Sequence, residues 1–111
     1  MIASVTELNL KNFWSFIRFI PHAVRCKIQA GKTPGLISIS FARDGILSQR
    51  TLTVWEDERS LIKYIGKGSH LKALQVFKKI AKDSYTVRYE CKEIPSWEEA
   101  KNKLNENGVK Y

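Results

Sequence analysis

The sequence has 111 residues, and its 19 lysines and arginines against 11 aspartates and glutamates give a formal net charge of +8. Apolar residues make up 43% of the chain and charged residues 27%, a balance that excludes disordered and low-complexity proteins. The longest charge-free stretch, Thr33 to Ala42, is far shorter than the ~20 residues of a bilayer-spanning helix. We therefore expect one domain over residues 1–111 with no transmembrane segment, and the absence of a secretory signal pattern favours the cytoplasm.

The positive charge is unevenly distributed. No acidic residue occurs from Leu8 to Arg43, and four of the basic residues within this stretch recur every seven positions. That spacing keeps side chains on one slowly drifting face of a helix. Such a face either attracts phosphate-bearing partners or lipid headgroups, or is an ordinary solvated surface, which we favour. The four residues are Lys11, Arg18, Arg25 and Lys32.

The first third of the chain predicts a strand followed by a helix. Ile2 to Leu8 is the expected strand, and the apolar residues after it are spaced three and four apart, as in an α-helix. Pro21 is expected to kink or divide this helix, and Gly31 is expected to end it. The positions expected to be buried are Leu10, Phe13, Trp14, Ile17, Ile20, Val24 and Ile28.

The middle of the chain predicts a β-hairpin. Leu36–Arg43 and Gln49–Glu56 both alternate in side-chain character, which is typical of half-buried strands. Asp44 and Gly45 between them are turn-forming residues. The two strands are therefore expected to pair.

The last part of the chain predicts two more helical regions around a final strand. Asp57–Glu58 suits a helix start, Gly66–Gly68 breaks this helix, and Ser69 is the expected N-cap of its continuation. Tyr85–Cys91 is the last expected strand. A final helix follows Ser96, which has the spacing of a capping box with the glutamate three residues later.

This order of elements predicts an α+β, ferredoxin-like fold. The arrangement is β-α-β-β-α-β with an extra C-terminal helix, and it forms an antiparallel sheet with helices on one side. The other face of the sheet is expected either to be solvated or to pack against a second copy, and Trp55 favours packing because it would be costly to leave in water. The residues assigned to this face are Ser38, Ser40, Thr51, Thr53, Trp55, Thr86, Arg88 and Glu90.

RNA-recognition domains share this strand order, so nucleic-acid binding needs a separate test. They stack bases on aromatic residues of the uncovered sheet face. Gln49–Glu56, the strand that would carry their signature, lacks the glycine and the paired aromatics, although Trp55 alone could stack one base. The sequence thus disfavours nucleic acid as a partner.

His70 is the candidate catalytic residue and the candidate metal ligand. It follows the expected cap and aligns with Ala73 and Phe77, so its ring is predicted to point inward. A helix N-terminus disfavours protonation of an imidazole, and a neutral imidazole can bind a metal or haem iron, or accept a proton. The alternative is a core histidine that is hydrogen-bonded to a backbone carbonyl.

Other reactive patterns are incomplete. His22 and Cys26 lie four residues apart on the first helix, but a zinc site needs further ligands that the sequence does not suggest. Cys26 and Cys91 lack the C-x-x-C spacing and are expected to be reduced thiols. Gly66–Ser69 lacks the spacing of a phosphate-binding loop.

Leu52–Leu61, followed by Gly68-Ser69-His70, resembles the dimeric α+β barrel superfamily of antibiotic-biosynthesis-type monooxygenases. Thr33–Leu36 and Ile94–Ala100 are similar to a bacterial branch of it that is akin to spheroidene monooxygenase. The resemblance implies a homodimer whose sheets pack face to face, with a pocket between helices and sheet in each subunit. The superfamily includes cofactor-free oxygenases, haem-binding and haem-degrading enzymes, and members without known activity, so it does not fix the reaction.

The resemblance also assigns roles to individual residues. His70 matches the haem-ligating histidine of the haem-binding branches. The haem-degrading branch has a tryptophan where this chain has Tyr64, and an asparagine where it has Thr6 and Glu7, so haem breakdown is not expected. Arg18 or Arg25 is the expected partner of a haem propionate. The implied pocket walls are Trp14, Phe41, Tyr64 and Phe77.

These observations lead to three functional hypotheses. The first is a homodimeric, monooxygenase-like protein that binds a small hydrophobic molecule, with His70-bound haem as its candidate cofactor. The second is a non-catalytic dimeric binding module. The third is a binder of nucleic acid or anionic surfaces through the basic helix face.

Overall fold

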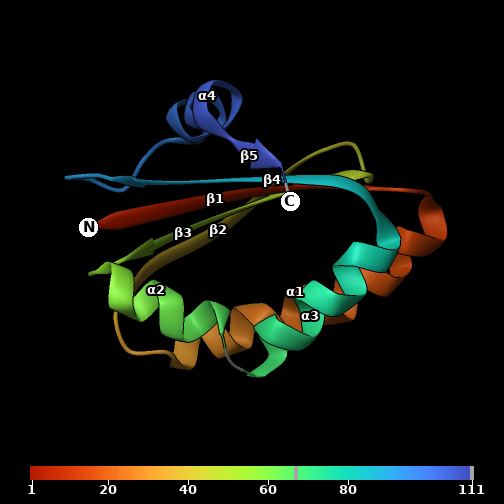
Figure 1. Cartoon of the computed structure of the whole chain (residues 1–111), viewed down its shortest axis with the longest axis horizontal. Helices are drawn as coiled ribbons and strands as arrows, with labels where there is room; N and C mark the ends of the chain where they lie inside the picture. Colours follow the sequence, from red (N-terminus) through yellow and green to blue (C-terminus); the bar gives the residue numbers. More distant parts are fainter. Residues whose placement is uncertain (67, 111) are drawn as a thin grey trace.

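The computed structural model describes residues 1–66 and 68–110, apart from the side chains of residues 69–71 and 74. Four helices and five strands are present in this part of the chain (Figure 1). In order they are β1 (Ile2–Leu10), α1 (Phe13–Lys32), β2 (Leu36–Asp44), β3 (Ser48–Trp55), α2 (Glu58–Ile65), α3 (Gly68–Ile80), β4 (Ala81–Glu90), α4 (Trp97–Asn107) and β5 (Val109–Lys110).

The strands form one antiparallel sheet in the order β2-β3-β1-β4-β5. This confirms the predicted α+β class and ferredoxin-like strand order. Helices α1, α2 and α3 lie on one side of the sheet, and α4 lies on the other (Figure 1). The short strand β5 and the position of a helix on the second face were not predicted from the sequence.

Side-chain caps explain where several helices begin. Asn12 accepts a hydrogen bond from the Ser15 amide at the start of α1, and Asp57 accepts one from the Ser60 amide (2.8 Å) at the start of α2. Ser96 caps α4 as predicted. Helix α3 begins at Gly68, so Ser69 lies inside it rather than at its cap, and the Ser69 side chain is outside the described residues.

The predicted assignment of the sheet faces is wrong. Cross-strand partners share a face, and the register pairs Phe41 with Thr51 but Ser40 with Leu52. Thr51 therefore faces the α1–α3 layer beside Phe41, while Ser40 is on the face that bears α4. Alternation identifies which residues of one strand share a side, but only the pairing register aligns neighbouring strands.

Trp55 also lies under the α1–α3 layer and is fully buried within the chain. Its ring centre is 5.1 Å from that of Tyr64, with Leu61 and Ala30 in the same apolar cluster. The inference that Trp55 needs a second copy to cover it is therefore wrong. It is a core residue of the single chain.

The side of helix α1 that packs against the rest of the domain is opposite to the predicted one. Its buried residues are Ser15, Phe19, Cys26 and Ala30, and one continuous helix includes Pro21. Of the residues predicted to be buried, Leu10 is buried but belongs to β1. The remaining six have exposed side chains, because a helical apolar stripe does not reveal which side meets the core. They are Phe13, Trp14, Ile17, Ile20, Val24 and Ile28.

Candidate functional site

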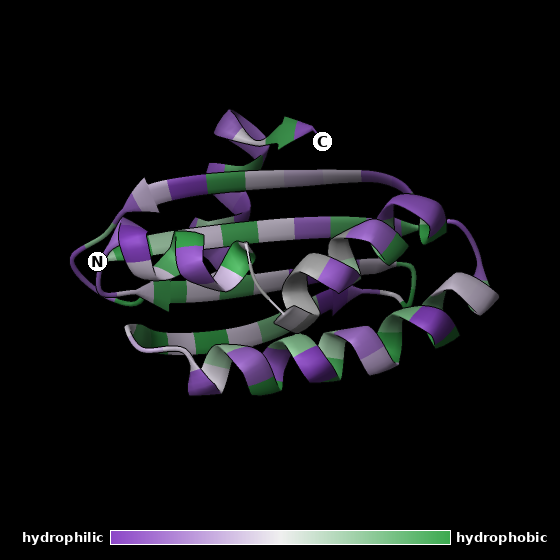
Figure 2. Cartoon of the chain, turned by 60° about the horizontal axis from the view of Figure 1, so that its bottom comes forward, coloured by the Kyte–Doolittle hydropathy of each residue, from purple (hydrophilic) through white to green (hydrophobic). Residues whose placement is uncertain are grey.

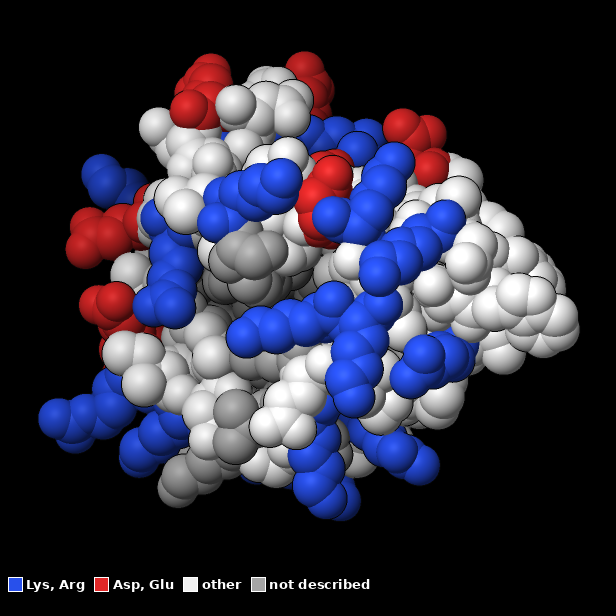
Figure 3. Space-filling view, turned by 45° about the vertical axis from the view of Figure 1, so that its right-hand side comes forward, with Lys and Arg blue, Asp and Glu red and all other residues white. Residues whose placement is uncertain are grey.

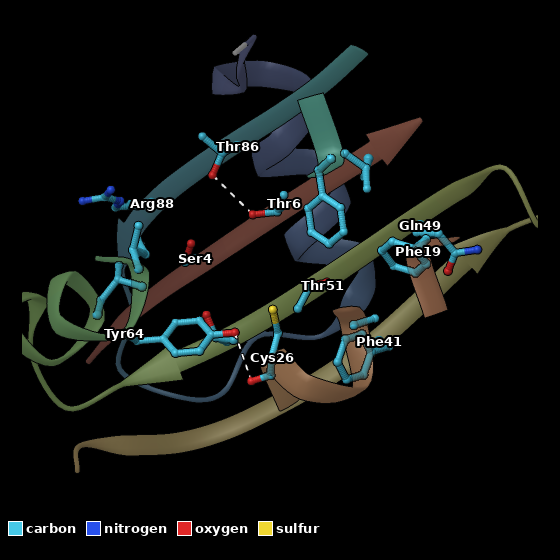
Figure 4. A pocket seen from close by; sticks show the side chains of 16 residues that line it. Ser4, Thr6, Phe19, Cys26, Phe41, Gln49, Thr51, Tyr64, Thr86 and Arg88 are labelled. Carbon is cyan, nitrogen blue, oxygen red and sulfur yellow. Dashed lines mark hydrogen bonds between the residues drawn. The ribbon is translucent and has the colours of Figure 1, made fainter. Parts of the chain in front are cut away.

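A cavity of about 300 Å³ lies between the sheet and the α1–α3 layer (Figure 4). This volume is at the lower end of the range for small-molecule binding sites. One wall of the cavity is the polar face of the sheet, and the opposite wall carries mostly apolar side chains from the helices. The cavity is therefore suited to a small molecule with both apolar and polar parts.

A row of threonines forms the centre of the sheet wall. Thr6 on β1 is the cross-strand partner of both Thr51 on β3 and Thr86 on β4. The Thr6 and Thr86 hydroxyl oxygens are 3.5 Å apart, and Thr86 also donates to the Val5 carbonyl at 3.3 Å. Because each hydroxyl is both a donor and an acceptor, this row can hydrogen-bond a polar group of a ligand.

Aromatic rings form the apolar part of the cavity. Phe19 of α1 and Phe77 of α3 contact each other, with ring centres 5.5 Å apart. Phe41 lines the cavity from the edge strand β2, and this residue is 43% exposed. The cavity therefore meets the molecular surface beside Phe41.

Cys26 and Tyr64 form a neutral pair in the cavity wall (Figure 4). The Tyr64 hydroxyl donates to the Cys26 carbonyl at 3.3 Å. Burial raises the pKa of the Cys26 thiol to about 11, and burial also raises the pKa of Tyr64. At neutral pH both groups keep their protons, so Cys26 does not present a thiolate nucleophile.

Arg88 supplies positive charge at the edge of the cavity. It extends from β4, its side chain is 44% exposed, and its Nη1 is 3.7 Å from Oε1 of Glu58. A long ion pair between exposed groups contributes little stability. The guanidinium can therefore turn to an anionic group of a ligand at low cost.

The structure brings three of the predicted pocket residues together. Phe41, Tyr64 and Phe77 all line the cavity. Trp14 does not, because its side chain is 74% exposed near the start of α1. The side chain of His70, on which the predicted chemistry depends, lies outside the described residues.

The other predicted ligand contacts lie elsewhere. Arg18 and Arg25 are exposed on α1 and are not among the described residues that line the cavity. His22 packs edge-on against Phe77, with ring centres 6.3 Å apart. Within the described parts of the chain, no group of three or more histidine, cysteine or acidic residues is placed to hold a metal ion.

Thr51, Thr86 and Arg88 are site residues that the sequence analysis placed on the wrong face of the sheet, and Thr6 was not assigned to a face. The alternation of side chains correctly grouped Thr51 with Thr53 on β3, and Thr86 with Arg88 on β4. Both groups were then assigned to the uncovered face of the sheet, although they face the helices. The same alternation would have identified these residues if the pairing register between β2 and β3 had been known. Polar residues on a covered sheet face are costly to pack against apolar side chains, which favours a cavity at that place.

The described architecture is thus a ferredoxin-like α+β domain with a small-molecule-sized cavity under its helices. A scan of protein-family models finds no match to this chain, and a search of curated proteins finds none either. Solved structures are similar in fold. No helix in the described residues is both long and apolar enough to cross a bilayer.

Three of these similar structures illustrate the match. SnoaB from Streptomyces nogalater, a cofactor-independent oxygenase, is 13% identical, with 86% of this chain and 97% of that chain covered and a TM-score of 0.70. An antibiotic biosynthesis monooxygenase is 10% identical, with 84% and 100% covered and a TM-score of 0.75. A conserved protein from Methanosarcina mazei Go1 is 18% identical, with 82% and 92% covered and a TM-score of 0.74. The chain therefore has the antibiotic biosynthesis monooxygenase-like fold, as the sequence resemblance implied.

Proposed function

We propose that this protein is monooxygenase-like and binds a small, largely apolar molecule in the cavity, with the polar end of that molecule toward the threonine row and Arg88. The two-sided cavity is the observation that carries the proposal. Phe19 and Phe77 offer an aromatic surface, while Thr6, Thr51 and Arg88 offer hydrogen bonds and charge. The similarity in fold to a cofactor-independent oxygenase supports an oxygenase reaction.

Arg88 gives this proposal a direct test with 2-naphthoate as the probe and 2-naphthalenemethanol as its neutral counterpart. We expect Arg88→Gln to weaken 2-naphthoate binding by about tenfold, because a charge-assisted hydrogen bond is lost. Binding of the neutral probe should be almost unchanged. Titration calorimetry on both proteins measures the two affinities.

Arg59→Gln is the matched control for this experiment, since Arg59 is an exposed arginine that is not among the described residues lining the cavity. It removes the same charge and should leave both affinities unchanged. Equal weakening of 2-naphthoate binding by the two substitutions would show a general charge effect, and would contradict a role for Arg88 in the site.

A haem cofactor held by His70 is the second form of the proposal. Among the described lining residues only Cys26 and Tyr64 carry groups of the kinds that bind haem iron, and burial raises the pKa of both, which opposes the proton loss that ligation requires. Haem binding therefore depends on His70. Haemin titration tests it, since the hypothesis expects a Soret shift that His70→Ala abolishes. A missing shift, or one that survives the substitution, removes His70-bound haem from the account.

We further propose that the protein is a homodimer that uses the sheet face bearing α4. Helix α4 packs mainly on β1 and β4, through Ala100 and Leu104, and β2 lies at the edge of the sheet. Ser38 and Ser40 lie on this face of β2 and are only half-buried. A second copy can cover this part of the sheet.

Light scattering tests the dimer. We expect the mass of two chains for the unmodified protein and the mass of one chain for Ser40→Arg. The arginine would bury a positive charge in the interface with no acidic group to pair with it. Lys63→Glu, at an exposed position of α2 on the other side of the sheet, is the control and should stay dimeric. A single-chain mass for the unmodified protein would contradict the dimer.

A non-catalytic binding module is the alternative function, and the chemistry of the cavity supplies its support. None of the described lining residues is a histidine, aspartate or glutamate, and the Cys26 thiol keeps its proton. This alternative expects the protein to bind 2-naphthoate. It also expects no oxygen consumption when an oxidisable aromatic analogue such as 1-naphthol is supplied. Oxygen uptake that stops when the cavity is blocked favours the oxygenase.

A further inference from the structure

The side of α1 that faces away from the sheet is apolar. Six large apolar residues of this helix have side chains that are 41–74% exposed. Phe19, Cys26 and Ala30 occupy the buried side. Figure 2 shows apolar and polar segments alternating along this helix. The six residues, here called the outer stripe, are Phe13, Trp14, Ile17, Ile20, Val24 and Ile28.

Basic residues accompany the outer stripe. Arg18, Arg25 and Lys32 are exposed on the same helix, and no acidic residue occurs between Leu8 and Arg43. Lys78 and Lys79 are exposed on α3, which packs beside α1. Figure 3 shows Lys and Arg side chains spread over the middle and lower part of the surface in that view, with acidic side chains in its upper part and at its left.

This combination of charge and apolar surface limits which partner fits. A second copy packed through the same stripe would bring basic residues of the two helices together, with no acidic residue on either helix to pair with them, and like charges repel. Nucleic acid would meet the charges but would leave Ile17, Val24 and other aliphatic side chains in water. An anionic bilayer surface satisfies both features, because the acyl boundary accepts the apolar side chains and the headgroups attract the basic ones.

We propose that the outer stripe of α1 docks on the surface of an anionic lipid bilayer, with the helix lying along the membrane plane. Trp14 is well suited to the headgroup region, since an indole has an apolar body and a polar N–H. The proposal does not depend on the cavity having a ligand. It assigns a membrane-facing side to a molecule in which no described helix is able to span the membrane.

Vesicle co-sedimentation tests the docking, with vesicles of phosphatidylcholine mixed with phosphatidylglycerol as the probe and pure phosphatidylcholine as the comparison. We expect the protein to pellet with the mixed vesicles and much less with the neutral ones. Tryptophan emission should also shift to the blue. Because Trp14 is 74% exposed and Trp55 is buried, Trp14→Phe should lose most of the emission change while still pelleting.

Charge variants test the electrostatic part of the contact. The double change Arg18→Gln with Arg25→Gln is expected to weaken binding to mixed vesicles roughly thirtyfold. The control pair is Lys92→Gln with Lys101→Gln, which removes the same net charge from exposed positions outside α1. This control should weaken binding by less than about threefold.

Apolar variants test the stripe itself. Ile17→Ser with Ile28→Ser should weaken binding to mixed vesicles by about tenfold or more, because two apolar side chains no longer leave water. Ile94→Ser with Val109→Ser is the matched control, since both residues are more than half exposed and lie outside α1. All four positions are on the surface, and circular dichroism should confirm that each variant is folded.

Several results on vesicle and oligonucleotide binding would overturn the proposal. They are no pelleting with mixed vesicles, equal binding to neutral and mixed vesicles, equal losses in the α1 variants and their controls, and binding to a single-stranded oligonucleotide without binding to vesicles. Self-association that Ile17→Ser with Ile28→Ser abolishes, in the absence of vesicle binding, would also overturn it and would assign the stripe to a second copy.

Discussion

Replacing Trp55 with alanine is expected to lower the free energy of unfolding by about 3–5 kcal/mol, the usual cost of removing a large buried aromatic side chain. Trp55 is fully buried and packs against Tyr64 and Leu61. Its indole nitrogen has no hydrogen-bond partner among the described residues, so the expected loss comes from packing. A domain of this size is stabilised by only about 5–15 kcal/mol, so this one change removes a large share.

Trp14→Ala is the matched control, because it removes the same side chain from an exposed position. We expect its free energy of unfolding to change by less than about 0.5 kcal/mol. Urea unfolding followed by circular dichroism measures both variants without depending on tryptophan emission. Similar small changes at both positions would contradict the burial of Trp55 and the cluster that fixes α2 against the sheet.

Replacing Thr51 with tryptophan is expected to abolish ligand binding, with a loss of affinity for 2-naphthoate of at least about a hundredfold. Thr51 lies in the middle of the sheet wall, between its cross-strand partners Thr6 and Phe41. An indole at this position would project into the cavity and take the place of the ligand. The domain should still fold, because the added atoms enter open space rather than a packed core.

Thr51→Ser is the control for this blocking variant, since it keeps the hydroxyl and removes only a methyl group. Its affinity for 2-naphthoate should fall by less than about fivefold. Calorimetric titration measures binding, and the melting temperature of each variant confirms folding. Unchanged binding in Thr51→Trp would show that the ligand binds outside the cavity.

The elements of the fold were predictable because their signals are local. The caps Asp57 and Ser96 mark helix starts, and alternation marks the strands on either side of Asp44 and Gly45. A helix-sheet order of this kind has few compact solutions, so the strand order followed from the element order. Sequence reasoning missed β5, because two residues are too short for a periodic signal.

The faces of the elements were not predictable because they depend on contacts between distant residues. On α1 the stronger apolar stripe is the exposed one, while the buried side includes the smaller residues Ser15, Cys26 and Ala30. The assumption that the most apolar side of a helix is its buried side therefore fails for α1, whose large apolar residues are exposed. In the same way, alternation alone could not show that Thr51 faces the helices.

The candidate site was predictable only in part. The resemblance named Phe41, Tyr64 and Phe77, and all three line the cavity. It also named Trp14, which is exposed. The row of hydroxyls opposite the aromatic residues became visible only once three strands were aligned.

The central claim is that the cavity between the threonine row and the α1–α3 layer binds a small molecule. The most direct measurement is an amide chemical-shift titration of the labelled protein with 2-naphthoate. We expect the largest shifts at Thr6, Thr51 and Thr86, with saturation at one ligand per chain. Shifts that are confined to the outer stripe of α1, or that never saturate, would contradict the claim.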